Sequence, residues 1–131
     1  MTSQLIHFGA EPTASDRQTR PLSPAVRAGD FIYVSGQVPV DAHGHIVDGG
    51  IEAQTRQVFA NLEAALALAG ATLADVCKTT VWLEDARDFG AFNRVYMDCL
   101  PGPKPARSTV ESRLMIPAKV EIDAVAYRPL R

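Results

Sequence analysis

The sequence predicts an α/β (α+β) fold in which two helices cover one face of a single sheet. Two segments repeat apolar residues at three- and four-residue steps, which is the period of a helix. Short runs rich in β-branched and aromatic residues lie before, between and after them, and such runs are typical of strands. The 131 residues are 47% hydrophobic and 21% charged, which favours one folded domain over residues 1–131 and argues against a disordered or fibrous protein.

The N-terminal quarter of the chain predicts a short strand followed by a hairpin. Gln4–Phe8 has a β-prone composition, and the polar segment Gly9–Arg20 is expected to be irregular. Ala25–Ala28 and Phe31–Ser35 are both β-prone and are separated only by Gly29-Asp30. A two-residue gap that contains glycine favours a tight turn between antiparallel strands.

The longest predicted element is a helix over Ile51–Ala69, and Gly70 supplies its C-terminal stop. Asn61 and Glu63 fall on the polar side of this helix, where we expect them to be solvated. The helical period is carried by Thr55, Val58, Leu62, Ala65, Leu66 and Ala69.

The segment before this helix, Gly36–Gly50, is rich in glycine and is expected to be a loop. Its tip holds His43 and His45, and imidazole is a common metal ligand. A third ligand is missing nearby in the sequence, so the pattern favours an exposed turn and we predict no metal site.

The second half of the chain predicts a strand, a helix and two further strands. Cys77–Leu83 is rich in β-branched and aromatic residues, and Phe89–Leu100 repeats large apolar residues at helical spacing. The proline-rich connector Pro101–Pro105 cannot continue the helix. Ala106–Arg113 and Lys119–Tyr127 are the last predicted strands, and the final one alternates apolar and polar residues.

One predicted strand is apolar on both of its faces. Phe31 and Tyr33 share one face, and Ile32 and Val34 share the other. Two helices cover only one face of a single sheet, and so small a chain has nothing left to cover the second. We therefore predict that another subunit packs on this face.

Composition narrows the possible functions. Thirteen Lys and Arg against fifteen Asp and Glu give a net charge of −2 without a block of like charge, which argues against a nucleic-acid partner. Met1–Phe8 lacks the pattern of a signal peptide, and Ala64–Ala71 is too short to cross a bilayer, so we expect a cytoplasmic protein without a membrane partner. Cys77 and Cys99 lack metal-binding or redox spacing and are expected to be buried free thiols.

Two charged residues stand in apolar strand contexts. Arg107 follows Pro105-Ala106 at the start of one strand, and Glu121 lies between Val120 and Ile122 in the next. If these strands pair as a hairpin, both charges fall near its open end. One interpretation, which the residue types alone favour, is a strand-edge ion pair worth at most about 1 kcal/mol. The other is a catalytic site. In the site, the guanidinium holds a carboxylate and Glu121 orients a water.

A third feature is the pair Ser35-Gly36 at the end of the buried strand. It puts a hydroxyl and approachable backbone N–H groups at one point. On its own, this pair favours a turn that leaves the sheet.

Six segments taken in order resemble the Rid (YjgF) family of reactive intermediate deaminases, some members of which carry an endoribonuclease L-PSP label. The resemblance covers nearly the whole chain. The Pro-Ala-Arg-Ser and Val-Glu-Ile segments correspond to the family's signature region, and their joint occurrence in this order is specific. The six segments are Ser35–Val40, Ala53–Gln57, Val76–Val81, Asp88-Phe89 with Asn93, Pro105–Val110 and Lys119–Ala124.

The resemblance implies a chorismate-mutase-like fold with a single mixed sheet, assembled as a homotrimer in which the sheets face a central barrel. It implies ligand sites in clefts between subunits. The implied reaction is hydrolysis of 2-imino and 2-enamino acids to 2-keto acids and ammonia, without a metal or an organic cofactor. The implied partner is thus a small imino or keto acid.

The resemblance also implies roles for single residues. Arg107 would bind the substrate carboxylate, and Glu121 would orient or activate the attacking water. An imine carbon is already electrophilic, so these two roles suffice for hydrolysis. The pocket would be lined by Ser35, Gly36, Asn93 and the backbone of Thr109.

Three departures from the family pattern point to a branch outside the best-studied one. Leu22 stands where the well-known deaminases have a tyrosine, so a pocket wall becomes apolar. Thr109 stands where many relatives have cysteine, which removes a thiol but keeps the backbone. The interval from Arg107 to Glu121 is about one residue shorter than usual.

Two alternative functions follow from these observations. A non-catalytic trimer that binds a small carboxylate, as a sensor or partner module, is favoured slightly by Leu22. An endoribonuclease is suggested by the label that some relatives carry, but the sequence lacks a basic stripe interleaved with aromatic residues.

Overall fold

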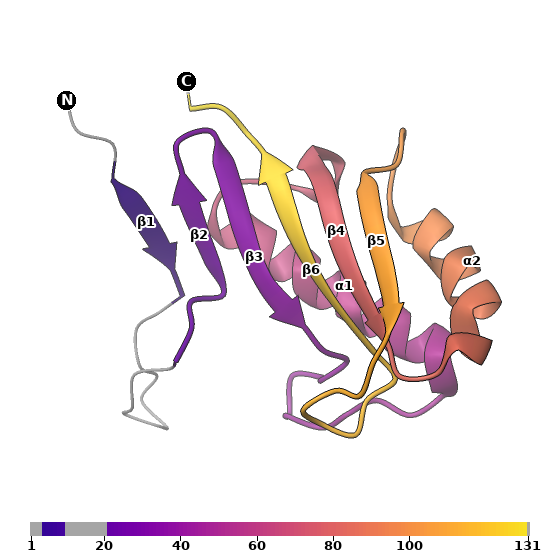
Figure 1. The fold of residues 1–131 in the computed structure, drawn as a ribbon. Coiled ribbons are helices and arrows are strands. Elements are labelled where there is room, and N and C mark those ends of the chain that lie inside the picture. The colour runs from indigo at the N-terminus through magenta and orange to yellow at the C-terminus, as the bar shows by residue number, and fades with distance from the viewer. Residues whose placement is uncertain (1–3, 10–20, 131) are drawn as a thin grey trace.

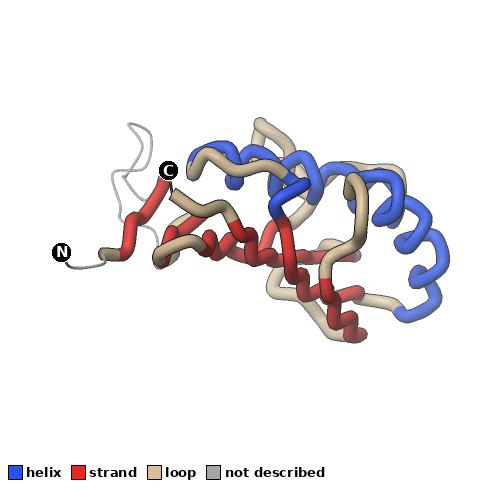
Figure 2. The backbone as a smooth tube through the Cα atoms, turned by 90° about the horizontal axis from the view of Figure 1, so that it is seen from above, coloured by secondary structure: helices blue, strands red, loops and turns tan. Residues whose placement is uncertain are grey.

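The computed structural model describes residues 4–9 and 21–130, and within them it has a single six-stranded sheet with two helices on one face (Figures 1 and 2). Most of the segment expected to be irregular lies outside the described residues. Elements and predictions agree to within one or two residues at each end. The strands are β1 (Leu5–Phe8), β2 (Ala25–Ala28), β3 (Phe31–Gln37), β4 (Val76–Leu83), β5 (Ala106–Glu111) and β6 (Val120–Tyr127), and the helices are α1 (Gly50–Leu68) and α2 (Phe89–Cys99).

The sheet has the strand order β1-β2-β3-β6-β4-β5, and β4–β5 is its parallel pair (Figure 1). The other neighbours are antiparallel. The sheet is therefore mixed, as expected. Both helices lie on the same side of it, so its core forms between that side and the helices (Figure 2).

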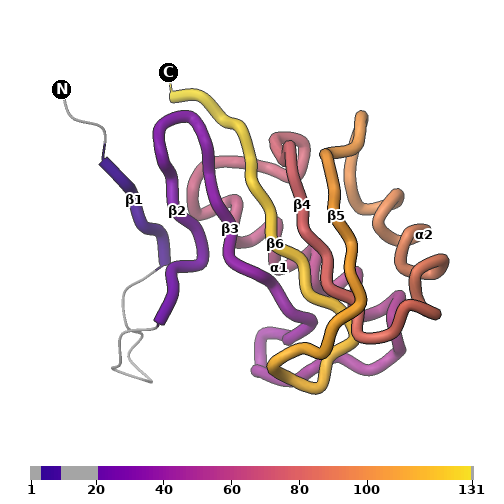
Figure 3. Tube along the Cα trace, in the orientation of Figure 1, coloured from indigo at the N-terminus to yellow at the C-terminus, as the bar shows by residue number. Residues whose placement is uncertain are grey.

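The last two strands do not pair as a hairpin, so the condition for placing Arg107 beside Glu121 is not met: β4 lies between β5 and β6 (Figure 3). The connector after β5 is eight residues long, from Ser112 to Lys119. A connection of that length lets the chain pass the end of β4 and return on its far side, whereas hairpin loops are usually two to five residues long. The position of β4 also separates Arg107 on β5 from Glu121 on β6.

The β2–β3 hairpin is confirmed, with Ala28 opposite Phe31 and a turn in which Gly29 has φ 62°. Strand β3 does not end at Ser35 as predicted. Its pairing with β6 shifts by one residue between Val34 and Gln37, so Ser35 and Gly36 form a bulge inside the strand.

The C-terminal stop of α1 is also confirmed. Gly70 has φ 78°, and the N–H groups of Gly70 and Ala71 donate to the carbonyls of Ala67 and Leu66. This is the Schellman arrangement, which satisfies carbonyls that the helix end leaves free. None of the helices in the described ranges is long and apolar enough to cross a membrane.

The face of the sheet away from the helices remains open in the single chain. Ile32 and Val34 are buried under the helices, whereas Phe31 is 40% and Tyr33 50% exposed on the other face. Tyr127 of β6 is 49% exposed there, with its ring centroid 5.3 Å from that of Phe31. Within the part of the chain that the structure describes, this apolar face is therefore left exposed, as the sequence predicts.

The two cysteines are free thiols, but the prediction that both are buried is wrong. A shift in the β4–β6 pairing between Val76 and Lys78 leaves Cys77 exposed, with its thiol donating to the carbonyl of Val125. Cys99 is half-buried, at the C-terminal end of α2.

Candidate functional site

Arg107 lies on the edge strand β5 with its side chain on the helix-covered face of the sheet. Its partner in the parallel β4 register is Thr79, a core residue that faces α2. The guanidinium reaches α2 itself, where its Nη1 donates to Oδ1 of Asn93 at 2.9 Å. The structure thus brings together two of the predicted site residues, from β5 and α2.

The guanidinium of Arg107 is surrounded by three aromatic rings of α2. Its Cζ lies 4.7 Å from the ring centroid of Tyr96, 5.6 Å from that of Phe89 and 5.7 Å from that of Phe92. Distances within about 6 Å attract a cation to the face of an aromatic ring. A cavity of about 370 Å³ opens beside the guanidinium, lined by Asn93, Tyr96, Met97, Lys104, Pro105 and Arg107. We call Arg107, Asn93 and these rings the arginine cluster.

Thr109 lies two residues beyond Arg107 on β5 and therefore points to the same face. Its hydroxyl oxygen is shielded from solvent and lacks a hydrogen-bond partner among the described residues. Thr109 also lines a cavity of about 230 Å³ together with Phe89 and Leu83. The third predicted residue therefore lies beside the arginine cluster, with a side chain as well as a backbone available.

Glu121 lies on the opposite face of the sheet. Its neighbours on β6, Val120 and Ile122, are fully buried under the helices, so Glu121 points to the open face. The carboxylate lies over the backbone of Gly36, and a Cβ at that position would overlap its Oε2 atom. The bulge in β3 and the missing side chain of Gly36 together make room for Glu121.

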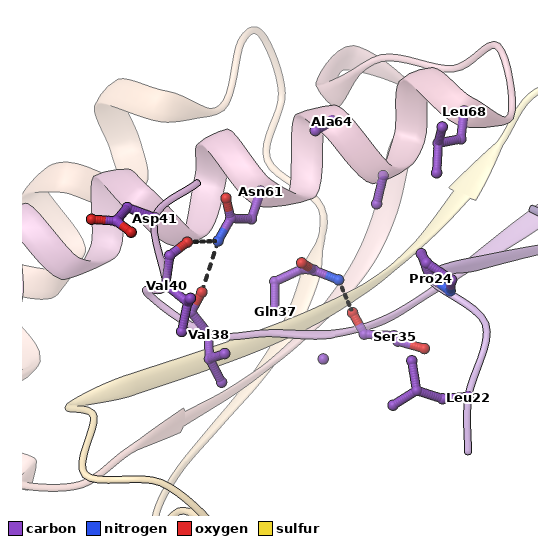
Figure 4. A pocket seen from close by; sticks show the side chains of 12 residues that line it. Leu22, Pro24, Ser35, Gln37, Val38, Val40, Asp41, Asn61, Ala64 and Leu68 are labelled. Atoms are coloured by element: carbon purple, nitrogen blue, oxygen red, sulfur yellow. Dashed lines mark hydrogen bonds between the residues drawn. The ribbon is translucent and has the colours of Figure 1, made fainter. Parts of the chain in front are cut away.

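Ser35 and Leu22 line the same cavity as Gly36. The Ser35 hydroxyl donates to the carbonyl of Ser23 at 2.6 Å, which ties β3 to the segment before β2. All three line a cavity of about 620 Å³ that extends to α1 (Figure 4). Glu121 is not among the residues that line this cavity, and it meets this group of residues through Gly36. We call Glu121, Gly36, Ser35 and Leu22 the glutamate cluster.

The environment of Glu121 disfavours its charged form. Partial burial raises the pKa of Glu121 above its ordinary value, and the negative charge of Asp123 raises it further. A carboxylate with a raised pKa and no ion-pair partner is a group that functional sites often contain.

The predicted ion pair between Arg107 and Glu121 is wrong. Along β4, Arg107 is level with Thr79 and Glu121 with Trp82, so the two are three residues apart as well as on opposite faces. Three residues of strand correspond to about 10 Å. Within the described residues, neither charge takes part in an ion pair; the salt bridges join Arg56–Asp98, Arg87–Asp85, Arg94–Glu52 and Arg128–Asp75.

His43 and His45 lie in an exposed turn, as the sequence predicts. Oδ1 of Asp41 accepts hydrogen bonds from the backbone N–H groups of both His43 and His45, which closes the loop locally. Across residues 4–9 and 21–130, no three His, Cys, Asp or Glu side chains are grouped as a metal site requires.

Sequence reasoning missed two contributions to the site region. Phe89, Phe92 and Tyr96 repeat at helical spacing, which predicts core packing, and their contact with Arg107 has no separate sequence signal. Asn61 was expected to be solvated, but its Nδ2 donates to the carbonyls of Val38 and Val40 and so holds the loop after β3 (Figure 4).

The family model described as Endoribonuclease L-PSP matches residues 13–128. The chain belongs to this family. A RutC family protein of Pyrococcus horikoshii is 47% identical over 110 residues, covering 82% of this chain and 87% of that protein. The predicted Rid (YjgF) membership is therefore confirmed, because solved structures described as RidA or as members of the YjgF or Rid family match this chain at 30% to 36% identity.

Solved structures that are similar to this chain have the same fold. Yeast Mmf1 superposes with a TM-score of 0.84 at 32% identity, covering 95% of this chain and 99% of that one. RidA of the Antarctic bacterium Psychrobacter superposes with a TM-score of 0.80 at 36% identity, covering 95% and 98%. The chorismate-mutase-like sheet with its two helices is thus the fold of this chain and of the family.

Proposed function

We propose that this protein is a homotrimeric hydrolase that converts 2-imino and 2-enamino acids to 2-keto acids and ammonia. One observation carries the proposal: Arg107 and Glu121 lie on opposite faces of one sheet, and neither forms an ion pair within residues 4–9 and 21–130. They lie too far apart in one chain to hold a single small substrate. A shared site therefore needs two copies, with the arginine cluster from one and the glutamate cluster from the other.

The surfaces of the chain suit such an assembly. The open apolar face, with Phe31, Tyr33 and Tyr127, is the kind of surface that subunits bury. Arg107 lies on the edge strand β5, where a neighbouring subunit is able to reach its cavity. Glu121 lies on the open face itself, so packing of that face against a neighbour carries it into the contact. The membership in the Rid family supports three subunits.

The arginine cluster suits a carboxylate. Within the described part of the chain, Arg107 uses one N–H for Asn93, and the arginine itself lines the cavity. A guanidinium binds a carboxylate through two parallel hydrogen bonds, which fixes the substrate's orientation. The rings of Phe89, Phe92 and Tyr96 supply the apolar surroundings that strengthen this interaction.

The glutamate cluster suits the activation of water. The Glu121 carboxylate takes a proton from water as the water oxygen forms a bond to the imine carbon, and it passes this proton to the imine nitrogen. In the resulting carbinolamine the hydroxyl proton moves through the same carboxylate to the amino nitrogen, the C–N bond breaks, ammonia leaves and the keto group forms. An enamine enters the same route after protonation at its carbon. The raised pKa of Glu121 makes it a stronger base for this step.

The direct test supplies 2-iminobutyrate generated in the assay by a pyridoxal-phosphate dehydratase, and follows the release of 2-ketobutyrate. We expect the wild type to accelerate release over buffer and Arg107→Ala to lose this acceleration. Arg56→Ala is the matched control, because Arg56 is an exposed arginine that pairs with Asp98 on the helix side. Equal rates for wild type and Arg107→Ala, or wild-type rates no faster than buffer, would contradict the proposal.

A second candidate function is binding of a small carboxylate without turnover. The observation that favours it is Leu22, which places an apolar wall beside Ser35 and Gly36 where a hydroxyl is expected. A thermal shift with 2-ketobutyrate, together with no turnover of any imine, would support this function. Cleavage of RNA by purified protein that Arg107→Ala abolishes would instead favour the activity that the family description names.

A further inference from the structure

Tyr96 lies beneath the guanidinium of Arg107 and is its nearest aromatic contact. Its ring centroid is 4.7 Å from Cζ of Arg107, about 1 Å closer than the other two rings. Tyr96 itself is only 4% exposed, so its position is set by the core and not by solvent.

The Tyr96 hydroxyl lies 2.7 Å from Oγ1 of Thr79. Thr79 is 1% exposed and is the register partner of Arg107 on the neighbouring strand β4. The three residues are therefore joined in a closed cycle of contacts. Strand pairing joins Arg107 to Thr79, a hydrogen bond joins Thr79 to Tyr96, and the cation–ring contact joins Tyr96 back to Arg107.

Packing of the Tyr96 ring and the protonated state of its hydroxyl keep this cycle of contacts in one arrangement. The Tyr96 ring meets Phe59 of α1 edge-on at 5.6 Å and Phe92 at 5.5 Å. Burial raises the pKa of Tyr96 above its ordinary value, so its hydroxyl stays protonated at neutral pH and remains able to share a hydrogen bond with Thr79.

We propose that Tyr96 and Thr79 are positioning residues for Arg107, holding its guanidinium in the orientation that receives a carboxylate. An arginine side chain has several rotatable bonds, and ordering it on binding lowers affinity. A guanidinium already ordered by Tyr96 and Asn93 avoids this cost. The identity of the ligand rests on the proposed function, whereas the ordering of Arg107 does not.

A role of Tyr96 in core packing alone makes a different prediction. Loss of one hydroxyl leaves the other buried without a partner and destabilises the protein, whereas loss of both restores an apolar pair of similar shape. A packing role therefore predicts that every effect of Tyr96→Phe disappears in the double variant Tyr96→Phe/Thr79→Val. A positioning role predicts that stability recovers in the double variant but substrate binding does not.

The experiment measures the order of the Arg107 Nε–Hε group by ¹⁵N relaxation, the Tm, and kcat and KM for 2-iminobutyrate. In both Tyr96→Phe and the double variant we expect lower order at Arg107 and a KM raised about threefold to tenfold, with kcat changed less than about twofold. Thr55→Val is the control, because it removes another buried hydroxyl bonded within α1.

Unchanged order and KM in Tyr96→Phe, or a return of both to wild-type values in the double variant, would overturn the inference. The two proposals fail separately. If the wild type does not hydrolyse the imine, the proposed function fails, and the order of Arg107 in the same variants still decides whether Tyr96 and Thr79 position it.

Discussion

The Glu121 carboxylate lies in surroundings that favour its protonated form, and this links catalysis to stability. Because the pKa of Glu121 is raised in the folded state, the folded state binds more protons than the unfolded state between the ordinary and the raised pKa. Stability contributed by this group is therefore present at low pH and lost as the pH rises through the raised pKa. The charge that the proposed reaction needs thus destabilises the fold at neutral pH.

Glu121→Gln tests this link. At pH 7 the variant should have a higher Tm than the wild type, because it lacks the partly buried charge. Below about pH 4 both states of the wild type are protonated and the difference should vanish. Its kcat should fall by about a hundredfold or more, because the base is lost. Thermal unfolding across the pH range is the measurement, and a lower Tm for the variant at pH 7 would contradict this description of Glu121.

Gly36→Ala tests whether the space over Gly36 positions Glu121. The added Cβ would overlap Oε2 of Glu121, and the flexible carboxylate would move away from it. We expect kcat to fall about tenfold to a hundredfold with little change in KM, because misplacement of a catalytic group lowers the rate and leaves the Arg107 anchor unchanged. Gly90→Ala in α2 is the matched control, since a Cβ there meets open space. Equal kcat values for the two variants would contradict the prediction.

The sequence draws attention to single residues of the candidate site but does not predict how they are grouped in space. Arg107 and Glu121 stand out in apolar strands, and the resemblance supplies their roles. Their distribution over two faces follows from the position of β4 between β5 and β6, which no local pattern records. The ring contacts of Arg107 likewise depend on where α2 crosses β5, so the sequence predicted Phe89, Phe92 and Tyr96 only as core.

Among the elements, the bulged strand β3 and the loop that follows it position the glutamate cluster. Asn61 of α1 holds this loop through hydrogen bonds to the carbonyls of Val38 and Val40, and Gln57 donates to Asn61 in turn. A polar side chain on a helix that satisfies loop carbonyls is common in folded proteins, because buried backbone groups need partners. The helical period alone places Asn61 on a polar face. It cannot show whether the Asn61 side chain contacts solvent or a neighbouring loop.

Asn61→Ala should therefore destabilise the protein by about 1 to 3 kcal/mol, because two carbonyls lose their donor. Glu63→Ala, a substitution at an exposed position of the same helix, should change stability by less than about 0.5 kcal/mol. Urea unfolding of both variants is the measurement. Equal midpoints for the two would show that the loop does not depend on Asn61.

The elements themselves were predictable because each carries a strong local signal. The helical period and the Gly70 stop predict α1, and the Gly29-Asp30 turn predicts the β2–β3 hairpin. Both predictions are correct, with boundary errors of one or two residues. The strand order was not predictable in the same way, because pairing of β4 with both β5 and β6 depends on contacts far apart in the sequence.

At the scale of the whole molecule, the open face of the sheet determines the expected assembly. Phe31, Tyr33 and Tyr127 form an exposed apolar area on the face that also carries Glu121. Burial of that area against neighbours would stabilise the oligomer and bring the two clusters together in one step. Assembly and catalysis are thus expected to depend on the same surface.

Tyr33→Glu should dissociate the proposed trimer into monomers and abolish the proposed imine turnover, because it puts a charge into the proposed interface. Ala67→Glu is the control, since it adds the same charge at an exposed position of α1. Sedimentation velocity reports the assembly state of both variants. A Tyr33→Glu protein that sediments as the wild type does would place the interface elsewhere.

The most direct test of a site shared between subunits is complementation of two inactive variants. Arg107→Ala and Glu121→Ala chains with different tags are co-expressed, and the mixed trimers are purified through both tags and identified by native mass spectrometry. An Arg107→Ala chain still offers an intact glutamate cluster, and a Glu121→Ala chain an intact arginine cluster. Each parent trimer is expected to be inactive.

A mixed trimer contains one chain of one variant and two of the other. In a cyclic arrangement, one of its three sites then receives both intact clusters. The mixed trimers should therefore regain roughly a third of the wild-type rate of 2-ketobutyrate release. Mixed trimers without any activity, formed from chains whose wild-type parent is active, would contradict the account.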